Sequence, residues 1–503
     1  MKSVKGVLRR VGMDRTICYA LMAQGWTLFS GPVTLWFLAA HLTPVEQGFY
    51  YTFGSVLGLQ VFFELGTSFV LLQFTSHEKA HLEWTSERTL TGDPRAKARL
   101  ASLLRRAMAW YGVLALLLVL VMIPAGWLFF EKSVANTPAA LKVGAQSIKN
   151  VFWQGPWVWL VCVTAGTLLM SPINAVVQGC GILAEFALLR FCQNVVTSLV
   201  SWVLLTLGWH LLAAPAFNMA ALLLSVVWVW KRYGAMLRDL WEFRVEGIEM
   251  NWMRDVWPLQ WKIGLSGISA FFAFSLFNPI LFALGRPIAA GQMGMTNAVL
   301  AAVAQGGGSW INTKLQPFGV LVARKKWREL DRLFFPALWQ SLVLVTVASL
   351  CVAGAIWALQ LSGHRWGVRF LPPLPLLLFI AATLANHVAG AQALYLRAHK
   401  KDPLIVVSVV TGAMTALCCY FGGRFFGLTG MMWGYFAVSL LFSLAAGTWV
   451  FQQKRQEWHT EEDDEQRDLV EITSDEIALL PFEVQAANSR IQAPLGEKRS
   501  EVH

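Results

Sequence analysis

Long apolar runs separated by short polar connections dominate this chain of 503 residues. A helix of about 20 mostly apolar residues crosses the hydrocarbon core of a bilayer. Runs of that kind lie near residues 17–41, 47–73, 108–130, 153–178, 186–208, 211–231, 258–284, 289–313, 336–361, 374–396, 403–424 and 428–451. The pattern predicts an all-α, polytopic membrane protein with about 12 transmembrane helices.

The composition agrees with this interpretation. Hydrophobic residues make up 56% of the chain, charged residues 14%, and the mean hydropathy is +0.51. Soluble domains contain roughly 45–50% apolar and about 25% charged residues. The composition therefore excludes a soluble enzyme, a disordered regulator and a disulfide scaffold, and it leaves membrane lipid as the surrounding partner.

The net charge of +11 reflects membrane topology rather than nucleic-acid binding. Basic residues concentrate in alternate connections: one set, including the amino terminus, holds 30 Lys and Arg residues and the opposite set holds 7. Cytoplasmic connections carry the excess of basic residues in membrane proteins. Both termini are therefore predicted to be cytoplasmic, and no nucleic-acid partner is expected.

Two similar turns suggest that the chain contains an internal repeat. Pro44 and Gly48 open the second predicted span, and Pro287 and Gly291 open the eighth with the same spacing. We therefore expect two pseudo-symmetric six-helix bundles, a pattern common in transporters. The predicted division is 1–232 for the amino-terminal bundle, 233–257 for a cytoplasmic linker, 258–451 for the carboxy-terminal bundle, and 452–503 for an acidic cytoplasmic tail.

The connections and the tail carry their own patterns. Residues 94–108 and 314–334 mix basic with apolar side chains and are predicted to be interfacial helices. The tail contains 13 acidic and 6 basic residues, so it is predicted to be largely disordered, with partner binding as the alternative.

Motifs of soluble catalysis and of nucleotide binding are missing from the sequence. Its cysteines show no metal-ligand spacing, so we expect no cofactor, no metal site and no catalytic residues. The glycines at 54/58 and 430/434 have the spacing of close helix packing, and Gly306–Gly308 suggest a kink.

Polar residues inside the spans are the functional candidates, because they are costly in lipid. Glu64 is a candidate for coupling to a cation or for an interhelical hydrogen bond. Arg190 and Lys262 lie at the inner ends of spans, where they either bind an anionic head group or extend to the interface. Candidates for lining a polar cavity are Asn174, Asn278, Asn297, Asn312 and His387.

Several segments resemble a known family. LTPVEQGFYYTFGSVLGLQVFFELGTSFVLLQF resembles the opening helix pair of bacterial polysaccharide-biosynthesis membrane proteins, and VQGCGILAEFALLRFCQ, VWPLQWKIGLSGISAFF and AAGQMGMTNAVLAAVAQ are similar to the same group. These are the Wzx-type flippases of the multidrug/oligosaccharidyl-lipid/polysaccharide (MOP) exporter superfamily. The resemblance covers residues 15–335, and residues 336–451 by topology.

The resemblance implies two bundles around a cavity that opens alternately to each side of the bacterial inner membrane. It implies a lipid-linked oligosaccharide as substrate, with cations such as Arg190 and Lys262 at the diphosphate, and polysaccharide-assembly proteins as possible partners of the tail. Two alternatives remain open at this stage. One is a cation-coupled exporter of small amphipathic molecules on the same fold, and the other is a membrane-embedded polysaccharide polymerase or ligase.

Overall fold

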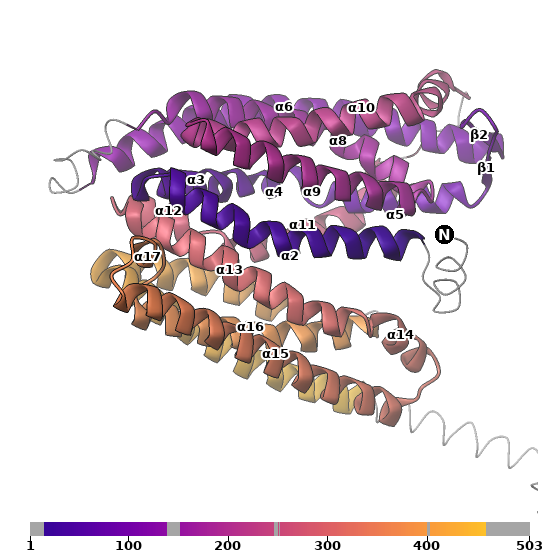
Figure 1. The fold of residues 1–503 in the computed structure, drawn as a ribbon. Helices are drawn as coiled ribbons and strands as arrows, with labels where there is room; N and C mark the ends of the chain where they lie inside the picture. Colours follow the sequence, from indigo (N-terminus) through magenta and orange to yellow (C-terminus); the bar gives the residue numbers. More distant parts are fainter. Residues whose placement is uncertain (1–14, 138–150, 246–249, 251, 400–402, 459–503) are drawn as a thin grey trace, which may run out of the picture.

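The computed structural model describes residues 15–137, 151–245, 250, 252–399 and 403–458 (Figure 1). The side chains of a few residues within these ranges, Lys262 among them, lie outside that description. The elements of the first half are α2 (Arg15–His41), α3 (Pro44–Leu57), η1 (Gly58–Gln60), α4 (Val61–Glu64), α5 (Thr67–Lys79), β1 (Leu82–Trp84), β2 (Leu90–Gly92), α6 (Pro94–Ala135), α8 (Gln154–Gly179), α9 (Leu183–Thr206), η3 (His210–Leu212) and α10 (Ala213–Glu242). Those of the second half are η4 (Trp252–Val256), α11 (Trp257–Phe274), α12 (Phe277–Ala283), α13 (Pro287–Asn312), α14 (Leu315–Ala323), α15 (Trp327–Leu361), η5 (Gly367–Arg369), α16 (Pro373–Ala398), α17 (Ile405–Val438) and η6 (Ser439–Ala446).

The prediction of an all-α, polytopic membrane protein is confirmed. Within the described residues, seven helices are long and apolar enough to cross a membrane, and the bent pair Pro44–Glu64 and Thr67–Lys79 adds an eighth. One of the seven, Ile405–Trp458, contains two of the predicted spans. The three remaining predicted spans coincide with α2, with α11–α12 and with α13, which are helical but do not meet the same criterion of length and hydropathy.

The stretch Ile405–Trp458 folds back on itself at Gly427, where φ is +70° and ψ is −153°. The two arms then lie close together, because a Cβ added at Gly422 would lie 2.5 Å from the carbonyl oxygen of Gly430. One at Gly434 would lie 2.9 Å from the carbonyl oxygen of Cys418. The predicted close packing at Gly430 and Gly434 is therefore present, within this hairpin.

The second predicted span is a broken helix. Leu65 and Gly66 both have left-handed backbone angles, with φ of +48° and +69°, and α4 meets α5 there at a bend. Glycine adopts this region without steric cost, whereas leucine does so only under constraint from its surroundings. The break places the polar segment around Glu64 at a bend in the span rather than on a continuous helix.

The two halves of the chain form separate groups of helices (Figure 1). In the first half α2 packs on α9, α6 on α8, and α10 on both α8 and α9, while in the second half α13 packs on α15, α16 on α17 and α11 on α17. The main contact between the halves joins α3 to α13, at the end of the molecule that the distribution of basic residues predicts to be external. Aromatic residues support it, since the rings of Phe49 and Phe282 lie 4.7 Å apart.

Several local predictions need correction. Residues 94–108 are the first turns of the 42-residue helix α6 rather than a separate interfacial helix, and a β-hairpin precedes them. In the segment 314–334, α14 is a separate helix but the remainder already belongs to α15. Helix α13 continues through Gly306–Gly308 without a break. Gly307 instead allows close packing, because a Cβ there would lie 2.1 Å from Cγ2 of Val345 on α15.

The region expected to link the two bundles, 233–257, begins as the end of α10 and ends with η4 and the first residue of α11. At the other end of the chain, helix continues to Trp458. The rest of the acidic tail, 459–503, lies outside the described residues.

Candidate functional site

The repeated Pro–Gly turns predicted from the sequence contact each other between the two halves. A Cβ added at Gly48 would lie 2.2 Å from the carbonyl oxygen of Pro287. One at Gly291 would lie 2.9 Å from the backbone nitrogen of Gly48 and 3.2 Å from the carbonyl oxygen of Pro44. Only glycine permits two backbones to approach so closely. The four residues therefore form a seal at the predicted external end of the molecule.

Hydrogen bonds of Arg369 and Gln47 connect the two halves beside this seal. Arg369 of η5 donates from Nη2 to the carbonyl oxygen of Leu42 at 2.6 Å and from Nη1 to Oε1 of Gln47 at 3.2 Å. Gln47 is 1% exposed and donates from Nε2 to the carbonyl oxygens of Gly291, at 2.9 Å, and Arg369, at 3.2 Å. Burial lowers the pKa of the Arg369 guanidinium from its ordinary value, a sign that the group is partly desolvated.

The segment that carries Arg369 is itself held in place by the second half. Gln292 of α13 donates to the carbonyl oxygen of Val368 at 2.9 Å, and Gln360 of α15 donates to that of Leu371 at 2.9 Å. The hydroxyl of Thr296 accepts from the backbone nitrogen of Leu371 at 3.1 Å. We call the pair Arg369 and Gln47, with its contact at Leu42, the latch. It joins a rigid turn of one half to the start of α3 in the other.

A cavity of about 620 Å³ lies between α2 of the first half and α13 and α15 of the second. Tyr51, which packs against Gly294 next to the seal, lines its near end together with Tyr50. The lining is almost entirely apolar, with hydroxyl groups from Thr27, Thr34 and the two tyrosines, and none of its described residues carries a charge. The cavity can therefore accept an apolar chain or an amphipathic molecule of moderate size.

Glu64 joins four helices at the break in the second span. Its Oε1 accepts hydrogen bonds from Ser68 of α5, from Tyr111 of α6 at 3.3 Å and from Ser171 of α8 at 3.4 Å. Ser68 also lies 2.9 Å from the Tyr111 hydroxyl and 2.5 Å from that of Ser171. One of the two roles predicted for Glu64 was an interhelical hydrogen bond, and such bonds are present. A carboxylate with one oxygen in a cage of hydroxyls also has the chemistry to exchange a proton or a cation.

The same break is a second point of contact between the halves. A Cβ added at Gly66 would lie 2.3 Å from Cγ2 of Ile263, and one at Gly264 would lie 3.0 Å from the side chain of Leu65. On the neighbouring turn, Gln260 donates to the Thr67 hydroxyl at 2.7 Å. Helix α11 of the second half therefore packs directly on the bend that presents Glu64.

Of the two candidate cations, Arg190 is not among the residues that line the cavity. Arg190 is exposed on α9, with its guanidinium 5.5 Å from the centre of the Phe186 ring. Lys262 lies on α11, and its side chain is outside the described residues. The structure thus brings Glu64 close to the helix that carries Lys262, but Arg190 stands apart from both.

The asparagines predicted to line a polar cavity lie on several helices and do not form one cluster. Asn174 accepts from Ser225 at 3.4 Å, and buried Asn278 donates to Ser55 at 3.0 Å, so each links two helices. Asn297 is partly buried on α13, whereas Asn312 at the end of the same helix is exposed.

His387 lies behind the cavity wall. Its Nε2 is 2.7 Å from the Ser341 hydroxyl, and that hydroxyl donates to the carbonyl oxygen of Gly307, a residue of the lining. Neither His387 nor any of the four asparagines is among the residues that line the cavity.

Some residues of the site were not predicted as candidates from the sequence; they are Gln47, Arg369, Tyr50 and Tyr51. Gln47 lies inside the repeated turn, which was a usable signal. Arg369 belongs to a connection of the predicted external set, where basic residues are few, and an isolated arginine in such a connection was a second signal. The hydroxyl-bearing aromatics Tyr50 and Tyr51 looked like ordinary span residues.

Comparison with known proteins gives a fold but no family. No protein-family model matches the sequence. No curated protein matches it either. Among solved structures, the chain is similar to a multidrug resistance MATE family transporter of the MOP superfamily in its inward-facing conformation, with 13% identity, a TM-score of 0.55, and coverage of 87% of this chain and 99% of that one. It is also similar to the lipid II flippase MurJ in an inward closed conformation, with 10% identity, a TM-score of 0.52, and coverage of 86% and 87%. The chain therefore shares its fold with these two membrane proteins.

Proposed function

We propose that this protein is a transporter that moves a polyprenyl-diphosphate-linked oligosaccharide across the bacterial inner membrane by alternating access, for assembly of surface polysaccharide. The observation that carries the proposal is the seal between the repeated turns, with the cavity directly beside it. A cavity between two pseudo-symmetric halves that are closed at one end is what alternating access requires. The sequence resemblance to polysaccharide flippases supplies the class of substrate.

The chemistry of the lining suggests which part of the protein contacts each part of such a substrate. An apolar cavity lined by α2, α13 and α15 suits the prenyl chain, while the tyrosine and threonine hydroxyls offer hydrogen bonds to sugar. The diphosphate needs cations in a dry site, where charge-assisted hydrogen bonds are strong. Lys262 on α11 and Arg190 on α9 are the proposed head-group cations, both at the predicted inner end; Arg190 lies outside the cavity and would meet the diphosphate before the substrate enters it.

Cells without the gene, complemented with variants, test the proposal. Loss of the protein is expected to stop surface polysaccharide and to trap the lipid-linked oligosaccharide on the cytoplasmic face of the membrane. Lys262→Ala and Arg190→Ala are expected to impair transport at wild-type protein levels, while Lys231→Ala, an exposed lysine on α10, serves as the matched control. Unchanged polysaccharide and unchanged lipid intermediate in the deletion strain would refute the proposal.

A second function, cation-coupled export of small amphipathic molecules, is favoured by one specific observation. The described cavity lining is uncharged. The Glu64 carboxylate lies at the bend between α4 and α5 and accepts hydrogen bonds from three hydroxyl groups. Under this alternative Glu64 binds the coupling ion, and transport of an amphipathic dye follows an ion gradient. Glu64→Gln keeps the shape of the side chain but removes its charge, so it is expected to uncouple export from the gradient in vesicles. Export of dye by the wild type without any effect on polysaccharide would favour this alternative.

A further inference from the structure

A second hollow, far from the cavity in the fold, opens between α6, α8 and α10. It has a volume of about 260 Å³, and its apolar wall includes Leu104, Ile173 and Leu237. Trp230 and Trp241 stand beside it and are 63% and 50% exposed. Exposed tryptophans mark the membrane–water interface. The hollow lies at the predicted inner end of these helices, on the group that Figure 1 shows on the side opposite α15 and α16. We call it the α6–α10 groove.

Gly234 opens this groove. It is a buried residue on α10, and a Cβ added to it would meet no atom within 4 Å. Glycine within a helix costs about 1 kcal/mol relative to alanine. Neither a turn nor a close approach of another backbone requires glycine at this position. The space that it leaves is continuous with the apolar wall and has room for a hydrocarbon segment.

Two opposite charges stand at the rim, one helical turn apart. Arg238 and Glu242 both border the groove, and the Arg238 guanidinium lies 5.4 Å from the centre of the Trp230 ring. Within the part of the chain that the structure describes, neither side chain forms an ion pair. The groove therefore presents a cation and an anion on one face of α10, above an apolar slot.

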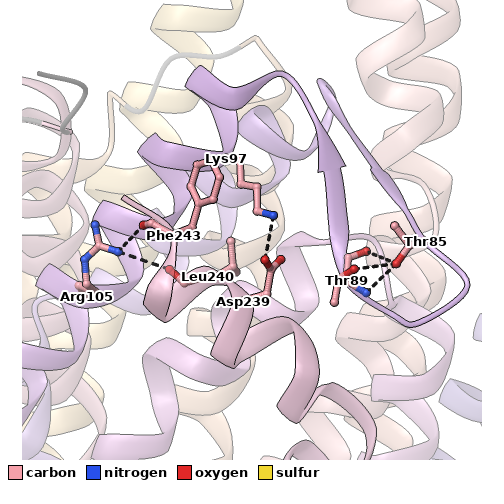
Figure 2. A network of polar contacts seen from close by, with 7 residues as sticks. All are labelled: Thr85, Thr89, Lys97, Arg105, Asp239, Leu240 and Phe243. Atoms are coloured by element: carbon pink, nitrogen blue, oxygen red, sulfur yellow. Dashed lines mark hydrogen bonds and ion pairs between the residues drawn. The ribbon is translucent and has the colours of Figure 1, made fainter. Parts of the chain in front are cut away.

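The end of α10 that carries these charges is fixed against α6 (Figure 2). Lys97 donates to Asp239 at 2.9 Å and lies 4.7 Å above the ring of Phe243. Arg105 donates from Nη1 to the carbonyl oxygens of Phe243, at 2.8 Å, and Leu240, at 3.3 Å. These contacts engage the neighbouring charges, so Arg238 and Glu242 remain on a rigid support for something outside the chain. A rigid support lowers the entropic cost of binding.

We propose that the α6–α10 groove binds a phospholipid whose head group carries a primary amine. The phosphate lies at Arg238, the ammonium at Glu242, and the first part of one acyl chain enters the space beside Gly234. A head group with one anion and one cation complements this rim, and a primary ammonium, unlike a trimethylammonium, also donates charge-assisted hydrogen bonds to the Glu242 carboxylate. An anionic lipid without an amine would leave Glu242 facing a negative charge. The groove is independent of the transport path, so the inference does not depend on the substrate proposed above.

Native mass spectrometry of the purified full chain in detergent tests the proposal. Dioleoyl phosphatidylethanolamine, phosphatidylcholine and phosphatidylglycerol are titrated separately, and bound lipids are counted. The wild type is expected to retain phosphatidylethanolamine most strongly. Arg238→Gln and Glu242→Gln are each expected to weaken it up to about fivefold, since an exposed ion pair contributes at most about 1 kcal/mol. Glu242→Gln is also expected to abolish the preference over phosphatidylcholine.

Gly234→Leu places its Cβ in open space and extends a larger side chain into the slot, so it is expected to remove the retained lipid. Lys231→Ala, on the same helix but outside the groove lining, is the control and is expected to bind as the wild type does. Thermal unfolding of each lipid-free variant shows that it is folded. Equal retention of phosphatidylethanolamine and either phosphatidylglycerol or phosphatidylcholine by the wild type would overturn the proposed recognition of the amine. Undiminished retention in a folded Gly234→Leu variant would overturn the site.

Discussion

The Arg369 latch makes the sharpest prediction about conformation. Arg369→Ala removes the two side-chain hydrogen bonds to Leu42 and Gln47 but leaves the bond from Gln47 to Gly291 in place. The backbone of the η5 turn stays anchored, because Gln292 and Gln360 hold it from their own helices. The variant therefore weakens the seal without dismantling either half.

The magnitude follows from the kind of bond that is lost. A hydrogen bond to a charged group contributes about 1.5–3 kcal/mol. Arg369 is only partly buried, so we take about 2 kcal/mol for the two bonds together, discounted for solvent screening. If these bonds form only in the closed conformation, their loss lowers the ratio of closed to open molecules about 30-fold. A ratio of about 100 would fall to about 3, and a minor open state would become measurable.

Double electron–electron resonance between spin labels at Leu207 and Leu361 measures this change. Both are exposed residues at the predicted external end, one following α9 of the first half and the other ending α15 of the second. With the native cysteines replaced by alanine, Arg369→Ala is expected to add a longer distance to the distribution. Arg365→Ala, an exposed arginine of the same connection, is the matched control. An unchanged distribution in folded Arg369→Ala protein would refute the latch.

Three further substitutions test the close approaches and the cavity. Gly66→Ala places a methyl group 2.3 Å from Cγ2 of Ile263 at a left-handed position, so a loss of about 2 kcal/mol in thermal unfolding is expected, and Ile263→Ala in the same chain should recover part of it. Gly48→Ala places a methyl group 2.2 Å from the carbonyl oxygen of Pro287 and is expected to lengthen the same spin-label distance as loss of the latch; an unaltered distance would contradict the seal. Gly306→Leu projects into the cavity from a position with open space around it, so it is expected to block complementation at a wild-type unfolding temperature, and full complementation would show that the cavity is not the path.

Sequence periodicity was sufficient for the helices, and it also suggested the repeated turns. Apolar runs set by bilayer thickness identify spans without any long-range information, and the Pro–Gly turns at 44–48 and 287–291 repeat because both open a helix at the same end of the molecule. Two repeated turns contact each other only if the axis that relates the two halves passes between the turns. The sequence could therefore suggest that the two turns are equivalent, but not that they touch.

The contacts that define the site depend on distant parts of the chain. Gln47 and Arg369 are 322 positions apart, and no local pattern relates an amide in one turn to an arginine in another. Leu65 and Gly66 break a helix whose apolar pattern is continuous, because α11 packs against the bend and stabilises left-handed angles that the local sequence does not require. The prediction for residues 94–108 failed for a related reason: a basic amphipathic pattern describes one face of a helix and does not say where that helix ends.

Transport of a defined lipid-linked glycan by the purified protein is the most direct test of the proposed function. Proteoliposomes that contain the wild-type chain and a fluorescent polyprenyl-diphosphate oligosaccharide are sampled with a membrane-impermeant quencher. The account predicts that the protected fraction of the glycan becomes accessible over time, faster than in liposomes without protein, and that Gly306→Leu abolishes this increase. Equal rates with and without protein, with the chain folded and correctly inserted, would contradict the central claim.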